Sequence, residues 1–279
     1  MMRLLLSLAL SLFAGSVISG NAKPGFDTFI AHRGESKDAP ENTLPAFKLA
    51  VERGFGFECD LYLSSDKRVF SFHDHNLRRT ARINMPTSSA SWEDVISKVD
   101  AGAWKGEQWK GVRPALLEEI LPLARKGRKI YVEIKTGPEI VPYVKEIFAK
   151  QDAANPETAL FICFNAKVCA ELKKQMPEYK VYWLCSAKVS KDNRSQPRPV
   201  QSIIDTLKSI NADGVDMQWD ASVATEEFVR KIKEAGFEFH VWTLDRLADS
   251  LAAFERGAQT VTTNCAKKQL DEYTAGAAE

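Results

Sequence analysis

The stretch Gly56-Phe57-Glu58-Cys59-Asp60-Leu61-Tyr62-Leu63 combines an apolar, strand-like run with two carboxylates. Because side chains alternate between the two faces of a strand, Glu58 and Asp60 lie on the same face. The other face is apolar and would pack under helices (Phe57, Cys59 and Leu61). We therefore expect both carboxylates to point into the interior of a helix-covered sheet, where unneutralised charges are costly.

Short apolar runs of this kind recur along the chain, and each is followed by a longer amphipathic run. Strands that alternate with helices imply parallel pairing with right-handed crossovers. Eight strands are enough to close a (β/α)8 TIM barrel, which is the fold that we predict. An open, doubly wound sheet is the alternative, but no glycine-rich phosphate loop supports it. The expected barrel strands are 29–31, 56–63, 130–134, 160–164, 181–185, 215–217, 239–244 and 260–263.

Three segments depart from this alternation. Residues 69–72 follow the second strand after a hairpin-length gap, which predicts an antiparallel partner or an added strand. Residues 76–114 hold three of the six tryptophans and predict an inserted loop or small subdomain over one end of the barrel. Residues 188–198 are polar and contain proline, which predicts a surface loop.

The overall composition is that of a soluble globular chain. Of the 279 residues, 44% are hydrophobic and 27% are charged. With 38 Lys and Arg against 37 Asp and Glu, the net charge is +1, so no overall basic field points to nucleic acid or to an anionic membrane. The sequence carries no signal for an oligomeric state.

Residues 1–22 have the features of a secretory signal peptide. A basic start at Arg3 precedes the apolar run 4–17, and small residues follow, so we expect cleavage after Gly20 or Ala22. The apolar run is shorter than the roughly 20 residues that span a bilayer, although an uncleaved anchor is the alternative. We expect residues 23–279 to form one exported domain, periplasmic or secreted, without a membrane span.

The five cysteines show no CxxC spacing and therefore no zinc site. An odd number leaves at least one free thiol. Cys59, Cys163 and Cys185 fall within strand-like runs, where cysteine behaves as a small hydrophobic residue.

Polar side chains gather where several predicted strands end. His32 and Arg33 follow the first strand, and Glu133 and Lys135 close the third. The carboxyl ends of barrel strands meet at one mouth, where active sites lie. Glu58, Asp60 and Glu133 would then offer three carboxylates without a thiolate, which suits Mg²⁺, Ca²⁺ or Mn²⁺. An ion-pair network could use the same residues.

Two of the four histidines, His32 and His73, stand at strand ends beside these carboxylates. Imidazole exchanges protons near pH 7, so one histidine can accept a proton while the other donates one. Together with Arg33 and Lys135 as donors to an anion, they predict a site for a phosphate ester. We expect His75 on a loop and His240 in a structural role inside a strand.

These residues resemble the motifs of the glycerophosphodiester phosphodiesterases. The resemblance covers about residues 29–270. It is carried by His32-Arg33-Gly34, Pro40-Glu41-Asn42-Thr43, Glu58-x-Asp60, His73-Asp74, Leu77-x-Arg79-Thr80, Leu117-Glu118-Glu119-Ile120-Leu121, Val132-Glu133-Ile134-Lys135 and Trp242-Thr243.

The resemblance implies a TIM barrel with an insertion after His73-Asp74 that hydrolyses glycerophosphodiesters to glycerol 3-phosphate and an alcohol. It implies that three carboxylates bind a divalent metal, Ca²⁺ or Mg²⁺, and that two histidines act as general base and general acid. It also implies that an arginine and a lysine bind the phosphate and that a tryptophan lies near the leaving alcohol. It also suggests Asn42 as a helix cap and Glu41 as a partner of Arg33. The implied site residues are Glu58, Asp60 and Glu133 for the metal, His32 and His73 for catalysis, and Arg33, Lys135 and Trp242 for the substrate.

Two positions depart from the family pattern. Where the family usually has Ser-Phe and Thr-Asp, this chain has Cys163-Phe164 and Thr263-Asn264, which bears on substrate preference. Two other functions remain open at this point. One is a phospholipase D-like enzyme acting on lysolipids or sphingomyelin, with tryptophans of the insertion as an apolar rim. The other is an inactive exported protein that binds phosphodiesters.

Overall fold

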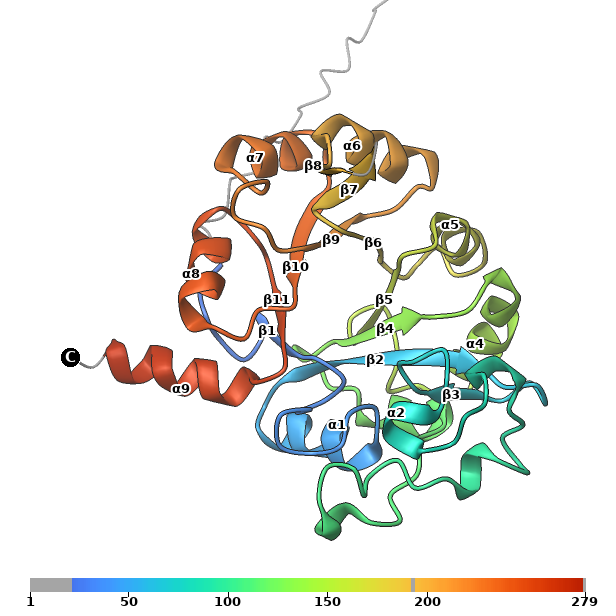
Figure 1. Cartoon of the computed structure of the whole chain (residues 1–279). Coiled ribbons are helices and arrows are strands. Elements are labelled where there is room, and N and C mark those ends of the chain that lie inside the picture. The colour runs from blue at the N-terminus through green and yellow to red at the C-terminus, as the bar shows by residue number, and fades with distance from the viewer. Residues whose placement is uncertain (1–21, 192–193, 278–279) are drawn as a thin grey trace, which may run out of the picture.

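The computed structural model describes residues 22–191 and 194–277, so all but the last residue of the predicted signal peptide lies outside the described part. Eight parallel strands close into a barrel, because the first strand pairs with both the second and the last (Figure 1). The predicted TIM barrel is confirmed. Its strands, in order around the barrel, are β1 (Phe29–Ala31), β2 (Gly56–Leu63), β4 (Ile130–Ile134), β5 (Ala159–Cys163), β6 (Val181–Cys185), β9 (Gly214–Gln218), β10 (Glu238–Trp242) and β11 (Val261–Thr263).

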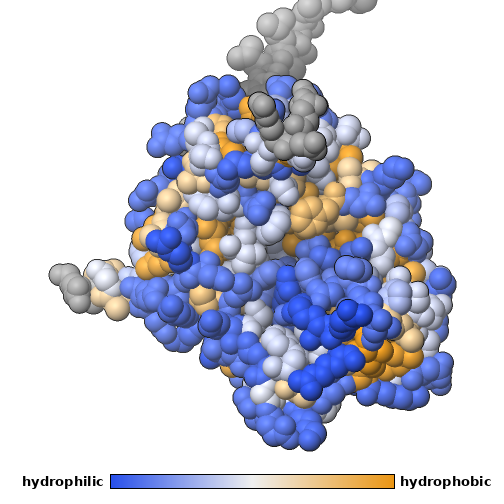
Figure 2. All heavy atoms as spheres, in the orientation of Figure 1, coloured by the Kyte–Doolittle hydropathy of each residue, from blue (hydrophilic) through white to orange (hydrophobic). Residues whose placement is uncertain are grey.

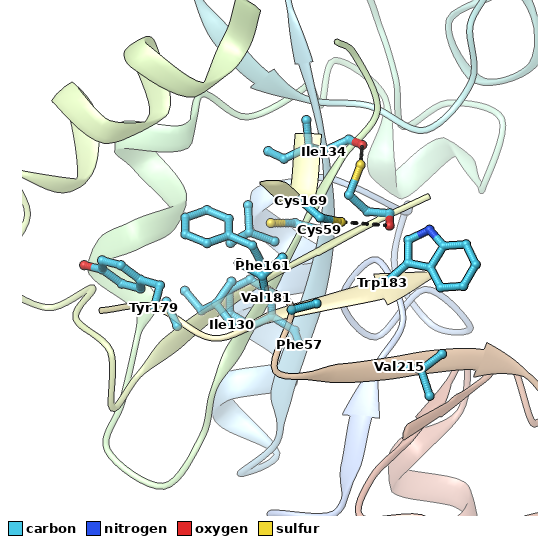
Figure 3. Packing of buried hydrophobic residues seen from close by; sticks show 14 of the residues in the cluster. Phe57, Cys59, Ile130, Ile134, Phe161, Cys169, Tyr179, Val181, Trp183 and Val215 are labelled. Carbon is cyan, nitrogen blue, oxygen red and sulfur yellow. Dashed lines mark hydrogen bonds between the residues drawn. The ribbon is translucent and has the colours of Figure 1, made fainter. Parts of the chain in front are cut away.

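Helices surround the barrel, and the outward face of each strand packs against them (Figure 1). This outer core includes Phe57 and Cys59 (Figure 3). It also includes Leu61, as the alternation of these residues with Glu58 and Asp60 predicts. The covering helices are α1 (Leu44–Glu52), α3 (Leu117–Ile120), α4 (Val141–Phe148), α5 (Ala166–Gln175), α6 (Val200–Ser209), α7 (Glu226–Glu234), α8 (Leu247–Glu255) and α9 (Ala266–Gly276). None of the helices in 22–191 and 194–277 is long and apolar enough to cross a bilayer.

All five cysteines are buried, free thiols. Within the core, the Cys163 thiol donates to the Ile134 carbonyl oxygen at 3.2 Å, and the Cys169 thiol donates to the Cys163 carbonyl oxygen at 3.5 Å (Figure 3). Burial raises the pKa of Cys185 to about 12. These cysteines act as small hydrophobic residues, as predicted for those in the strands.

The segment after β2 forms a separate small cluster beside the barrel. β3 (Val69–Ser71) pairs antiparallel with β2, which confirms the predicted hairpin. Residues 76–114 then form short helical elements, whose apolar side chains pack on Tyr62 and Phe70. Trp92 is buried in this cluster, and Trp104 and Trp109 are partly buried. The short elements are α2 (Arg78–Ala81), η1 (Thr87–Ser89), η2 (Ile96–Lys98) and η3 (Glu107–Trp109).

Two predicted local structures are wrong. Residues 188–198 are not a plain loop, because β7 (Lys188–Lys191) and β8 (Arg194–Pro197) pair as an antiparallel hairpin. A two-stranded ribbon has open edges, which tolerate charged residues and proline, so the polar composition is misleading. The first helix begins at Leu44, with Thr43 at its N-cap. Asn42 is therefore not the cap, and its side chain bonds elsewhere.

Candidate active site

Three buried carboxylates lie close together inside the barrel, near the carboxyl ends of its strands, which we call the upper end. One oxygen from each of Glu58, Asp60 and Glu133 lies within 4.8 Å of the others. β2 and β4 place them together, because Asp60 and Glu133 are register partners on adjacent parallel strands. Burial and the two neighbouring carboxylates raise the pKa of Glu58 well above its usual value, and burial and Asp60 raise that of Glu133 to about 7. The cluster therefore favours any added positive charge.

Two cations partly balance the cluster. Lys135 Nζ lies 2.7 Å from Glu133 Oε1 and 3.3 Å from Asp60 Oδ1, and Arg33 Nε lies 3.5 Å from Asp60 Oδ2. Burial alone would raise the pKa of Asp60, but Lys135 and Arg33 outweigh it and hold the pKa at about 2. Glu58 Oε1 and Asp60 Oδ1 still lack a hydrogen-bond partner. Unpartnered, buried carboxylate oxygens are the donors that a hard divalent cation prefers, so the residues fit a metal.

A left-handed turn after β1 brings Arg33 to the cluster. Arg33 has φ +57° and Gly34 has φ +77°. In this conformation the Arg33 backbone N–H donates to Glu58 Oε2 at 2.8 Å. A Cβ atom on Gly34 would come within 2.5 Å of the Ala46 backbone in α1, so only glycine fits there. The Arg33 guanidinium donates to Glu41 Oε1 at 2.8 Å, which confirms Glu41 as its partner.

Asn42 holds the carboxylate of Asp60 in place. Its Nδ2 donates to Asp60 Oδ2 at 2.7 Å, and its Oδ1 accepts from the Asp60 backbone N–H and from the Ser71 hydroxyl. This buried network fixes the direction of the Asp60 side chain and leaves Oδ1 aimed at Lys135. The contacts explain why Asn42 does not cap α1.

The side chain of His32 is oriented by residues that follow β10 and β11. Asn264 Oδ1 lies 2.7 Å from His32 Nδ1, and Asn264 Nδ2 donates to Asp245 Oδ2 at 2.7 Å. Because Nδ2 faces a carboxylate, Oδ1 must be the atom facing His32, so His32 carries its proton on Nδ1 and presents Nε2 as an acceptor. Burial and then Arg33 lower the pKa of His32 to about 4, which keeps it neutral.

The side chain of His73 is oriented by Asp74, which is itself held by Arg79. His73 Nδ1 lies 2.7 Å from Asp74 Oδ1, and Arg79 Nε donates to Asp74 Oδ2 at 2.6 Å. Arg79 also donates twice to Glu41, the partner of Arg33. With Nδ1 engaged by Asp74, the atom of His73 that is left to transfer a proton is Nε2.

A cavity of about 230 Å³ joins these groups at the barrel mouth. One side is polar and contains both histidines, Arg33 and Lys135, and the other is apolar (Ile162, Phe164, Leu184 and Trp242). Figure 2 shows a hollow on this face with hydrophobic residues along one side and hydrophilic residues along the other. Trp242 Nε1 donates to the Asp216 carbonyl oxygen at 3.0 Å, which fixes the indole in the wall.

The structure thus brings every predicted site residue to one cavity or its acidic floor. His75 lies on an exposed loop and His240 is buried at the other end of the barrel, as expected. The sequence reading singled out neither Asp74 nor Asp245 for orienting the histidines, nor Asp216 in the cavity wall. The signal for Asp216 is an acidic residue between the apolar Val215 and Met217 of β9.

Two histidines beside an arginine and a lysine at a barrel mouth form an arrangement that is suited to the hydrolysis of phosphate esters. The sequence profile of the Glycerophosphoryl diester phosphodiesterase family matches residues 32–268, most of the chain. The chain therefore belongs to this family, and it is an enzyme of the glycerophosphodiester phosphodiesterase class. It is 28% identical to a glycerophosphodiester phosphodiesterase of Caldanaerobacter subterraneus over 84% of this chain and 93% of that protein. It is 26% identical to one of Bacillus subtilis over 93% and 92%.

Solved structures show the same fold. A phosphodiesterase of Oleispira antarctica, in complex with the product sn-glycerol-3-phosphate, superposes with a TM-score of 0.77 at 24% identity, over 88% of this chain and 96% of that one. A putative glycerophosphoryl diester phosphodiesterase of Silicibacter pomeroyi gives 0.74 at 18% identity, over 91% and 96%.

Proposed function

We propose that the protein hydrolyses glycerophosphodiesters to glycerol 3-phosphate and an alcohol by metal-dependent acid–base catalysis. The observation that carries the proposal is the single cavity in which two oriented histidines face Arg33, Lys135 and the carboxylate cluster. Family membership agrees with it. Each part of the cavity corresponds to one requirement of the reaction.

Glu58, Asp60 and Glu133 would hold one divalent cation, Ca²⁺ or Mg²⁺, because all three offer oxygen ligands and none offers sulfur. When bound, such an ion supplies Lewis-acid polarisation of a phosphoryl oxygen.

Arg33 and Lys135 bind the phosphate. Both cations line the cavity and pair with buried carboxylates, Arg33 with Asp60 and Lys135 with Glu133. Prearranged cations stabilise the negative charge that develops on the phosphoryl oxygens in the transition state.

His32 is the general base and His73 is the general acid. His32 is neutral, with Nε2 as an acceptor, and can take the proton of the nucleophile, either water or the glycerol 2-hydroxyl. His73, oriented by Asp74, protonates the leaving alkoxide, which is too basic to depart unaided. If the 2-hydroxyl attacks, a cyclic phosphate forms first and water then opens it. Trp242 lies beside the leaving alcohol.

The residues that would carry the two other functions do not favour them. A lipid substrate calls for an exposed apolar rim, but Trp92 is buried and Trp104 and Trp109 are partly buried. An inactive binding protein would be expected to have lost part of the acid–base set, but both histidines and all three carboxylates are present. We also propose export of the chain, on the strength of the signal-like residues 1–22.

The test is the release of glycerol 3-phosphate from glycerophosphocholine by the purified protein. We expect turnover that EDTA abolishes and added Ca²⁺ or Mg²⁺ restores, and that His32→Ala removes. Free choline together with a lysophosphatidate or cyclic lipid phosphate from a lysolipid would instead support the lipid reaction. Metal binding without turnover of either substrate would contradict the proposal.

A further inference from the structure

One carboxyl group in the cavity takes no part in the chemistry described so far. Asp216 is only 1% exposed, lines the cavity, and has no hydrogen-bond partner on either oxygen. A buried polar group without a partner destabilises the folded protein, so its presence requires an explanation. Unlike Glu58 and Asp60, it does not belong to the carboxylate cluster.

The barrel aims this side chain inward. On β9, Val215 and Met217 pack outward under the helices, so Asp216 between them faces the interior. Its register partner on β6 is Leu184, part of the apolar wall, and its partner on β10 is His240. No basic side chain in the described residues is paired with Asp216 in an ion pair. The group is thus held without a counter-charge.

The residues that line the cavity differ in exposure, so the side with the buried Asp216 is called the closed part here and the side with exposed residues the open part. The open part is marked by Phe164, which is 46% exposed and lies edge-on against Trp242, with ring centroids 5.5 Å apart. Glycerophosphodiesters share one half, the glycerol, and differ in the other, the head group. A variable head group needs the open part, which leaves the glycerol for the closed part beside Asp216.

We propose that Asp216 is a specificity-determining residue that recognises a hydroxyl group of the substrate's glycerol half. The inference rests on the proposed function and names which half of the diester lies in the closed part of the cavity. Burial, and then Glu133, raise the pKa of Asp216 well above its usual value, in support of a neutral carboxyl. A neutral carboxyl both donates and accepts, which matches a hydroxyl group, whereas an ammonium head group would need a carboxylate.

Binding measurements separate this role from the catalytic one. Calorimetry in buffer with Ca²⁺ or Mg²⁺ compares sn-glycerol 3-phosphate with n-propyl phosphate, which has the same skeleton without hydroxyls. We expect the wild-type protein to prefer glycerol 3-phosphate by about tenfold, the value of one good hydrogen bond. Asp216→Leu should lose the preference, and Asp216→Asn, which keeps a donor and an acceptor, should retain most of it.

The matched control is Asp205→Leu, which removes an exposed carboxylate on α6 and should leave the preference unchanged. The Trp242 bond uses the main chain of Asp216, so side-chain variants preserve it. Asp216→Leu should also raise Tm, because it removes an unpartnered buried group. An unchanged preference in Asp216→Leu, or a loss of Tm in both Asp216 variants, would overturn the inference.

Two further outcomes are distinguishable. If Asp216→Asn and Asp216→Leu weaken the binding of glycerophosphocholine equally and leave the preference for glycerol 3-phosphate unchanged, Asp216 pairs with a head-group cation and the inference is wrong. If the Asp216-dependent preference is found in a protein that turns over no glycerophosphodiester, the proposed function fails while the inference holds.

Discussion

The two ends of the barrel hold the same kinds of side chain in opposite arrangements. At the lower end, where the strands begin, Glu238 accepts hydrogen bonds from Lys180 and from the Tyr182 hydroxyl, the latter at 2.5 Å. His240 stacks on Tyr182, with ring centroids 4.2 Å apart, and its Nδ1 lies 2.7 Å from the Thr260 hydroxyl. At the upper end, carboxylate oxygens of Glu58, Asp60 and Asp216 have no hydrogen-bond partner.

This difference shows that the volume of a cavity alone does not identify the candidate active site. The lower cavity, about 270 Å³, is larger than the upper one, about 230 Å³. Its carboxylate at Glu238 is nevertheless neutralised and hydrogen-bonded by its own neighbours, which is what a structural site requires. The upper carboxylates keep oxygens without a hydrogen-bond partner, which a ligand can use. Predictions can therefore be made in pairs, one residue from each end.

The largest expected contrast is between His32 at the upper end and His240 at the lower end. His32→Ala should lower kcat/KM by about 10³-fold, because a general base contributes roughly 10²–10⁴-fold. His240→Asn should change kcat/KM less than tenfold, since His240 faces the lower cavity. Steady-state kinetics on glycerophosphocholine measures both, with Tm as the control for folding. Equal losses in the two variants would break the distinction between the ends.

The next contrast concerns metal-dependent stability. A ligand that binds only the folded protein stabilises it by about 2.7 kcal/mol at a hundred times its Kd. Ca²⁺ or Mg²⁺ should therefore raise Tm in the wild-type protein and in Glu238→Gln, but not in Glu133→Gln. Thermal scans with and without EDTA provide the measurement. A metal-induced rise that survives in Glu133→Gln would remove that residue from the metal site.

A smaller effect is expected from Glu238 itself. Glu238→Gln weakens the bonds from Lys180 and Tyr182 and should lower the free energy of unfolding by about 1–3 kcal/mol. Glu58→Gln should do the reverse in EDTA, because it relieves repulsion among three buried carboxylates. Urea titrations of both variants test the opposite signs. Destabilisation by both would show that the upper carboxylates are structural as well.

The smallest contrast is in pH dependence. Burial lowers the pKa of His240 below its unfolded value of 6.5, so below pH 6.5 the unfolded chain binds a proton that the folded chain refuses. The free energy of unfolding therefore falls as pH falls from 6.5 towards the folded pKa. His32, with a pKa of about 4, contributes in the same direction. His240→Gln should flatten part of this slope in urea titrations at stepped pH, and an unchanged slope would mean that His240 takes up its proton in the folded state.

Most of the upper site was predictable because strand periodicity determines it. Alternation in 56–63 places Glu58 and Asp60 inward, and the convergence of strand ends brings Glu133, His32 and Lys135 to them. The residues that orient these groups were harder to find. Asn264 reaches His32 only because β11 closes against β1, a contact across 232 positions of sequence.

Local rules failed where tertiary contacts outweigh them. Asn42 is a good capping residue next to a helix, but bonds to Asp60 and Ser71 satisfy its side chain instead. The hairpin β7–β8 is polar on a solvent-facing ribbon, so its strands lack the apolar alternation that identifies barrel strands. Asp216 is visible in sequence as an acid among apolar neighbours, but only its lack of a partner marks it as functional.

The closure of the barrel by β11 has a consequence for synthesis. β11 ends at Thr263, and the next residue, Asn264, orients the His32 that lies at the opposite end of the chain. Until translation has passed this point and the last strand has docked beside the first, neither the closed barrel nor the contact that orients His32 exists. A nascent chain lacking these residues would therefore be inert, and hydrolysis would begin only after the whole domain has been synthesised and has folded.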